Sequence, residues 1–145
     1  MDKKEFKEKS IMTTLFQGNS KAYVICFLAA LIELWYTLTV LDVIEVNFMM
    51  GIITFINIVL LFSLFTAAVK VKIYSEKWAN FTLLMALYVF IRAFYLIPFI
   101  VKPYNKNMEL IVLNILLGIL LALSGLLTLS IINKRNPYLE LRNKN

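Results

Sequence analysis

The chain has 145 residues, is 61% hydrophobic and carries a formal charge of +6, with a mean hydropathy of +0.78. Soluble domains are closer to half apolar, so this composition excludes an ordinary soluble fold and indicates an integral membrane protein. With a single cysteine and no histidine, the chain cannot form an intramolecular disulfide, a Cys/His zinc site, a histidine-ligated haem or a histidine-activated nucleophile. We expect no metal and no cofactor.

Four apolar stretches are each long enough to cross a bilayer, and they comprise Ala22–Ile44, Val46–Val69, Trp78–Val101 and Met108–Ile132. The shortest has 23 residues, which corresponds to about 34 Å of helix against about 30 Å of hydrocarbon. The stretches are apolar throughout and lack the alternation of barrel strands. The sequence therefore predicts an all-α integral membrane protein that forms a compact four-helix transmembrane bundle.

Charged residues flank the four predicted spans. Residues 1–21 form a charged, briefly amphipathic segment, which we expect at the membrane interface, and residues 133–145 form a polar tail. Twelve basic residues lie in these two tails and between the second and third spans, whereas only Lys102 and Lys106 lie on the other side. Short loops with this bias predict that both termini are cytoplasmic. Topology and acidic lipid headgroups account for the net charge, so we expect no nucleic-acid partner.

Each predicted span carries one strongly polar side chain at a similar depth. Counted from the outer ends of their spans, Glu33 and Asn57 lie about 16 Å deep, Arg92 about 14 Å and Asn114 about 9 Å. An unpaired charge at such a depth costs roughly 2.5–3.5 kcal/mol on insertion scales. Glu33 is the only acid and Arg92 the only base in the apolar interior. We therefore predict a buried ion pair with Asn57 or Asn114 beside it.

Helical spacing adds three residues to this intramembrane polar cluster. Thr37 follows Glu33 by four residues and shares its face. Tyr88 and Tyr95 share a face with Arg92, so their rings and hydroxyl groups are expected to flank the guanidinium group. Such a cluster can fix helix register and the choice of partner helix. Alternatively, it can have a functional role as a titratable carboxylate, a ligand-binding polar pocket or a contact to another subunit.

The fourth span has a stripe of small residues at Gly118, Ala122 and Gly125. Small residues let a neighbouring helix backbone approach closely, so this stripe indicates packing within the chain or an oligomer seam. In the last turn of the third span, Pro98 lacks a backbone N–H. We expect a structural kink there, with a gate hinge as the alternative.

Three functions are compatible with these features, and the favoured one is a non-catalytic accessory or interaction subunit of a membrane complex. The four spans leave no room for a soluble domain, and the chain has no catalytic signature. This hypothesis predicts a larger membrane partner or self-association, in addition to the lipid bilayer. The abundance of lysine, asparagine and isoleucine suggests an AT-rich bacterial genome and hence a location in the cell membrane.

The second hypothesis is a small transporter or channel that uses Glu33 as a titratable or cation-binding carboxylate. The motif "LIELW" resembles the small multidrug resistance transporters, in which a glutamate of the first helix couples protons to cationic substrates. This chain is longer, its charge bias opposes dual topology, and Arg92 competes for the carboxylate, so the family is not assigned.

The third hypothesis is a membrane enzyme that uses arginine and tyrosine side chains. In these two residue types "IRAFYL" resembles the four-helix membrane enzymes that use glutathione. The acidic and basic signatures of that group are missing, and we expect no catalytic residues.

Overall fold

The computed structural model describes residues 17–43, 48–97 and 104–143 of the chain. Within these ranges it contains helices α2 (Ser20–Val43), α3 (Phe48–Lys72), α4 (Glu76–Ile91), η1 (Arg92–Leu96) and α6 (Tyr104–Asn143), and no strand. Four helical stretches are long and apolar enough to span a membrane: Ser20–Asp42, Phe48–Lys72, Glu76–Tyr95 and Met108–Asn136. The predicted all-helical fold with four potential spans is therefore confirmed. The interfacial segment predicted for residues 1–21 lies mostly outside the described residues.

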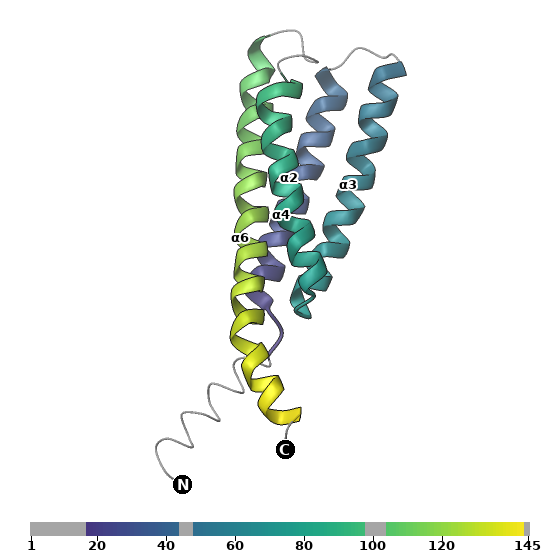
Figure 1. Cartoon of the computed structure of the whole chain (residues 1–145). Helices are drawn as coiled ribbons and strands as arrows, with labels where there is room; N and C mark the ends of the chain where they lie inside the picture. The colour runs from purple at the N-terminus through teal and green to yellow at the C-terminus, as the bar shows by residue number, and fades with distance from the viewer. Residues whose placement is uncertain (1–16, 44–47, 98–103, 144–145) are drawn as a thin grey trace.

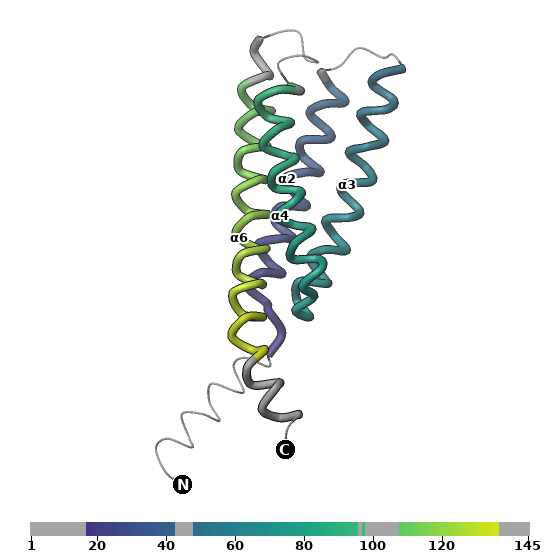
Figure 2. Tube along the Cα trace, viewed as in Figure 1, coloured from purple at the N-terminus to yellow at the C-terminus, as the bar shows by residue number. Residues whose placement is uncertain are grey.

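The helices run up and down in one bundle, in which α6 packs closely on both α4 and α2 (Figure 1). Helix α3 packs mainly on α2, less on α4 and least on α6. The trace in Figure 2 shows the start of α2 and the far half of α6 at the same end of the bundle. The chain thus enters and leaves its transmembrane region at one end.

Small side chains form much of the buried core, above all in α2. In α2, Ala22, Cys26, Ala29 and Ala30 are fully buried. They pack in one core with alanines of α3 and α4 and with larger residues of α3, α4 and α6, namely Leu60, Leu64, Ala67, Ala68, Val71, Ala86, Val89, Leu117 and Leu121. Most of the exposed large side chains are leucine, isoleucine, valine and phenylalanine. The hydrocarbon tails of lipids solvate such side chains as well as another helix would. Close backbone packing through small residues therefore holds the bundle together.

Helix α6 extends beyond the predicted fourth span. It has 40 residues and continues from the expected end at Ile132 to Asn143. Residues 133–143, expected as a separate tail, are helical. The prediction rests on the length of the apolar run, whereas α6 also includes the polar residues that follow this run. Bilayer thickness limits the length of the apolar run, but it does not limit the length of the helix.

The third membrane helix changes its geometry at Arg92. Helix α4 gives way to the π-helical segment η1, in which the N–H of Ile97 donates to the carbonyl of Arg92. A bond over five residues makes a wider turn than the α-helical bond over four. The kink predicted at Pro98 falls outside the described residues.

Candidate functional site

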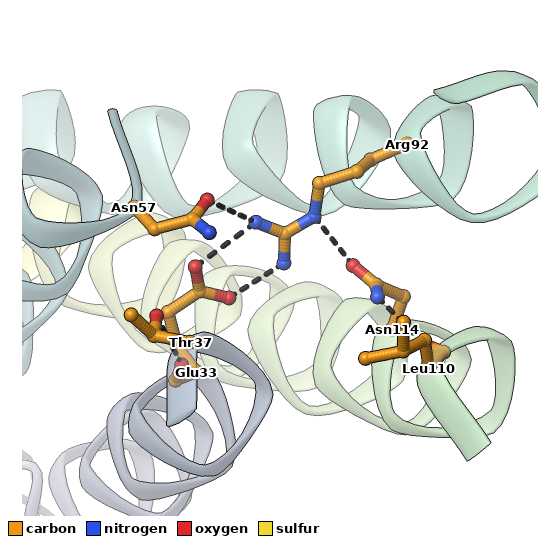
Figure 3. Close-up of polar contacts among 6 residues, drawn as sticks. All are labelled: Glu33, Thr37, Asn57, Arg92, Leu110 and Asn114. Atoms are coloured by element: carbon orange, nitrogen blue, oxygen red, sulfur yellow. Dashed lines mark hydrogen bonds and ion pairs between the residues drawn. The ribbon is translucent and has the colours of Figure 1, made fainter. Parts of the chain in front are cut away.

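Glu33 of α2 and Arg92 of η1 form a bidentate ion pair in the interior of the bundle (Figure 3). Nη2 of Arg92 lies 2.6 Å from Oε2 of Glu33, and Nη1 lies 2.9 Å from Oε1. The arginine side chain is 3% exposed and the glutamate side chain is fully buried. Two parallel N–H bonds match the planar fork of the guanidinium group to the carboxylate, so each ion replaces much of the hydration that the other has lost.

Two amides from the remaining helices complete what we call the charged cluster, consisting of Glu33, Asn57, Arg92 and Asn114. Nε of Arg92 donates to Oδ1 of Asn114 over 2.6 Å, and Nη1 donates to Oδ1 of Asn57 over 3.2 Å. Asn114 in turn donates to the carbonyl of Leu110 over 2.7 Å. All four membrane-spanning segments therefore meet at one guanidinium group (Figure 3).

Asn57 is the incompletely paired member of the charged cluster. It is 2% exposed, and its Nδ2 has no hydrogen-bond partner among the described residues. Turning the amide over would place its NH₂ group against the Arg92 donors, which offer no acceptor. The amide orientation is thus fixed by Arg92 at the expense of two buried N–H groups, which carry a desolvation penalty of about 1–3 kcal/mol.

Two tyrosine rings cover the guanidinium group. Cζ of Arg92 lies 3.9 Å from the ring centroid of Tyr36 and 5.8 Å from that of Tyr88. Both distances lie within the range of cation–π attraction. Sequence reasoning included Tyr88 and missed Tyr36, which is only 4% exposed. The signal was present, because Tyr36 follows Glu33 by three residues and lies one turn further on the same face.

Thr37 and Tyr95 differ from the expected arrangement. The hydroxyl of Thr37 is buried beside the cluster and donates to the carbonyl of Glu33 over 2.8 Å, so its partner lies in its own helix. Tyr95 is 76% exposed and does not join the cluster. The expectation assumed 100° per residue, but the wider π-helical turn advances each residue by less. After Arg92 each side chain is therefore rotated less about the helix axis than in an α-helix, and Tyr95 points outward.

Two of the three small residues of α6 face α4. A Cβ atom at Gly118 would lie 2.8 Å from Cζ of Phe90, and one at Gly125 would lie 2.7 Å from Oγ1 of Thr82. Both distances are too short for a carbon atom, so Gly118 accommodates a ring and Gly125 accommodates the neighbouring helix itself. Ala122 is half-buried against the core. This part of the stripe is occupied by packing within the chain.

A second set of polar contacts lies where α2 begins, and we call Asn19, Ser124 and Thr128 the neutral network. Nδ2 of Asn19 donates to Oγ1 of Thr128 over 3.1 Å, and its Oδ1 accepts from the N–H of Ala22 over 3.3 Å as an N-cap. The hydroxyl of Ser124 donates to the carbonyl of Ala22 over 2.9 Å. The sequence analysis missed this network, although an asparagine just before a long apolar run is a helix-start signal.

An open groove of about 470 Å³ lies near the opposite end of α2 and α6. The indole N–H of Trp35 donates to Oε1 of Glu109 over 3.5 Å at this groove. Its lining includes no member of the charged cluster, and comprises Trp35, Leu38, Thr39, Leu41, Asp42 and Glu109. The groove and the ion pair are therefore separate features.

No family model, curated protein or solved structure matches this chain. The described residues contain no group of three or more histidine, cysteine, aspartate or glutamate side chains that could hold a metal ion. Both oxygens of the buried Glu33 carboxylate bond to Arg92. All three guanidinium nitrogens of Arg92 bond to this carboxylate or to the amides of Asn57 and Asn114.

Proposed function

We propose that this chain is a non-catalytic accessory subunit and that the outward face of α3 binds a transmembrane helix of a partner protein. The observation that carries the proposal is Gly51. A Cβ atom built at this glycine meets nothing within 4 Å, whereas Gly118 and Gly125 are covered by α4. Small residues in membrane helices favour close approach of another backbone, and at Gly51 no part of the described chain makes that approach.

Aromatic side chains border this open glycine. Phe48 is 83% exposed and Phe55 is 68% exposed. Residues three, four and seven apart share one side of a helix, so Gly51 forms a notch between the two rings. A partner helix that crossed at Gly51 would contact the glycine backbone and the edges of both rings.

Helix α3 is also the least enclosed of the four. Of its most apolar 18-residue stretch 28% is buried, against 39% for the stretches of α2 and α6. Packing and interhelical hydrogen bonds hold helices together in lipid, so a helix with fewer contacts within its own chain gains most from a partner. The incompletely paired amide of Asn57 is consistent with an α3 that is not fully fixed by this chain alone.

The charged cluster supports a structural role over transport. Glu33 would have to give up two short bonds to Arg92 before it could accept a proton or a cation. Breaking a buried pair of this kind costs about 3–5 kcal/mol. The cluster therefore acts as a fixed anchor for four helices rather than as an exchangeable site.

The location and orientation form part of the same proposal. The bias of basic residues toward the end where the chain enters and leaves the bundle favours cytoplasmic termini. With both termini on the cytoplasmic side of a bacterial cell membrane, Gly51 lies in the outer half of the bilayer, because α3 begins at the outer side with Phe48.

Site-specific photo-crosslinking in the membranes of the host cell tests this proposal. A photo-reactive amino acid at Phe55 on α3 is expected to give one defined product containing a second membrane protein. The same amino acid at Leu84 on α4, which is 62% exposed, is expected to give only lipid adducts. Gly51→Leu should abolish the Phe55 product, since a leucine fills the notch.

The matched control is Ser130→Leu on α6, which adds similar bulk at an exposed position of another helix. This variant should leave the Phe55 product unchanged. The proposal is wrong if Phe55 gives lipid adducts alone, or if Gly51→Leu and Ser130→Leu reduce the product equally. A product that consists of two copies of this chain would show self-association at Gly51 and would contradict binding to another protein.

A further inference from the structure

Cations gather at the end of the bundle where α3 turns into α4. The described residues at this end include five exposed lysines and the half-buried Arg135, and the lysines are Lys21, Lys70, Lys72, Lys77 and Lys134. Glu76 is the acidic residue described there. Two of these cations, Lys72 and Arg135, lie over tyrosine rings.

Tyr74 organises the contacts of Arg135. Its backbone φ is 61°, a left-handed conformation that is strained for a bulky residue. Its hydroxyl donates to the carbonyl of Gln17, and Cζ of Arg135 lies 4.2 Å from its ring centroid. The turn after α3, the segment before α2 and the end of α6 thus meet at one aromatic ring.

Lys72 is held against the same segment. Its carbonyl accepts from the N–H of Asn19 over 2.9 Å, and its Nζ lies 5.1 Å from the ring centroid of Tyr23. Its side-chain carbon Cγ lies 3.7 Å from the position of a Cβ atom on Gly18. Lys72 thus contacts Gly18 directly, and Arg135 is linked to Gln17 through Tyr74. Each cation is oriented by a tyrosine ring.

We propose that Lys72 and Arg135 together bind the phosphate group of an acidic phospholipid. Lys72 is the last residue of the span in α3, and Arg135 precedes by one residue the last residue of the span in α6. Both cations therefore stand at the level where hydrocarbon ends and headgroups begin, which favours a lipid over a free anion. Two oriented cations lose little side-chain freedom on binding, so this pair contributes more than exposed lysines nearby.

Titration of the purified full-length chain with a fluorescent short-chain phosphatidylglycerol in neutral detergent tests the proposal. The double variant Lys72→Gln/Arg135→Gln should weaken binding about thirty-fold or more, since it removes both charge-assisted contacts to the phosphate group. The control Lys77→Gln/Lys134→Gln removes the same charge from exposed positions and should weaken binding by less than about threefold. The charge-conserving Lys72→Arg/Arg135→Lys should bind nearly as well as the native chain.

The proposal is wrong if the two glutamine pairs weaken binding equally, because diffuse charge then explains the affinity. It is also wrong if phosphatidylcholine binds as tightly as phosphatidylglycerol. Displacement of the lipid by inorganic phosphate at similar concentration would assign the site to a free anion. If the first glutamine pair does not fold, three other results decide the question. They are the preference of the native chain for phosphatidylglycerol over phosphatidylcholine, the displacement of the lipid by phosphate, and the loss of binding in the exposed-lysine control.

Discussion

The charged cluster and the neutral network both bury polar groups, but they satisfy these groups by different routes. In the charged cluster, side chains from four helices bond to one another around Arg92. In the neutral network, short side chains bond largely to backbone: Ser124 reaches the carbonyl of Ala22, and Thr128 the carbonyl of Ser124. A buried ion needs several hydrogen-bond partners, and here they come from several helices. A buried hydroxyl group needs only one carbonyl, so it lets α2 and α6 pack closely.

The largest effect is expected from separating the two ions. Arg92→Leu leaves a buried carboxylate at Glu33 without its counterion, which should lower the free energy of unfolding by about 3–5 kcal/mol. Glu33→Gln/Arg92→Gln keeps hydrogen-bonding groups without charge and should recover at least half of that loss. Ser124→Ala in the neutral network should cost only about 0.6 kcal/mol. Unfolding by dodecyl sulfate in mixed micelles measures all three, and a double variant as unstable as Arg92→Leu would contradict the assigned role of the pair.

A second prediction separates the two amides of the charged cluster. Asn114 accepts a 2.6 Å bond from Nε of Arg92 and donates to Leu110, so Asn114→Ala should cost about 1.5–3 kcal/mol, as for hydrogen bonds to charged groups. Asn57 accepts a longer bond and leaves its NH₂ group without a partner among the described residues. Asn57→Ala should therefore cost less than about 1 kcal/mol, because it also removes an unsatisfied group. The same micelle unfolding experiment ranks the variants, and equal losses would show that Asn57 holds Arg92 as firmly as Asn114 does.

A third prediction concerns the glycines that let α6 approach α4. A Cβ atom at Gly125 would lie 2.9 Å from the backbone carbonyl of Ala79 as well as against Thr82, so Gly125→Ala must push the helices apart at a cost of about 1–3 kcal/mol. At Gly118 the obstacle is the ring of Phe90, which can rotate, and Gly118→Ala should cost less. Thermal unfolding of both variants in one detergent gives the order. The reverse order would mean that the ring of Phe90 is fixed more tightly than the backbone of α4.

The smallest predicted effect lies in the neutral network. Asn19→Ala removes the N-cap of α2 and the bond to Thr128, which should cost about 1 kcal/mol. Thr128→Val keeps the shape and the cap, so its cost should be about half as large. Hydrogen exchange of the amides in the first turn of α2 distinguishes the two variants: exchange should accelerate in Asn19→Ala and stay near the native rate in Thr128→Val. Faster exchange in both would indicate that the cap depends on Thr128.

The difference between the two regions also explains how much the sequence could predict. Four long apolar runs determine the number of helices, because few arrangements of such runs are stable in lipid. The pairing of Glu33 with Arg92 followed from scarcity, since each is the only residue of its sign at that depth. The structure brings the two together with both asparagines.

The neutral network offered no comparable signal. Serine and threonine are common in membrane helices, and most satisfy their own helix four residues back, as Ser63 and Thr66 do. No pattern in a single sequence marks Ser124 as a serine that instead reaches a carbonyl of another helix. The outward turn of Tyr95 could not be predicted either, because the π-helical bond between Arg92 and Ile97 changes the helical phase only where it occurs.

The wide turn at Arg92–Leu96 has a consequence for how this chain could tolerate changes in length. A π-helical turn contains about one residue more than the α-helical turn that it replaces. A deletion of one residue among 93–96 would therefore let the helix resume ordinary geometry with Arg92 still facing Glu33. The same deletion in the turn before Arg92 would rotate the guanidinium group by about 100° away from its counterion. Deletions of one residue should thus be accepted on the far side of Arg92 and rejected on the near side.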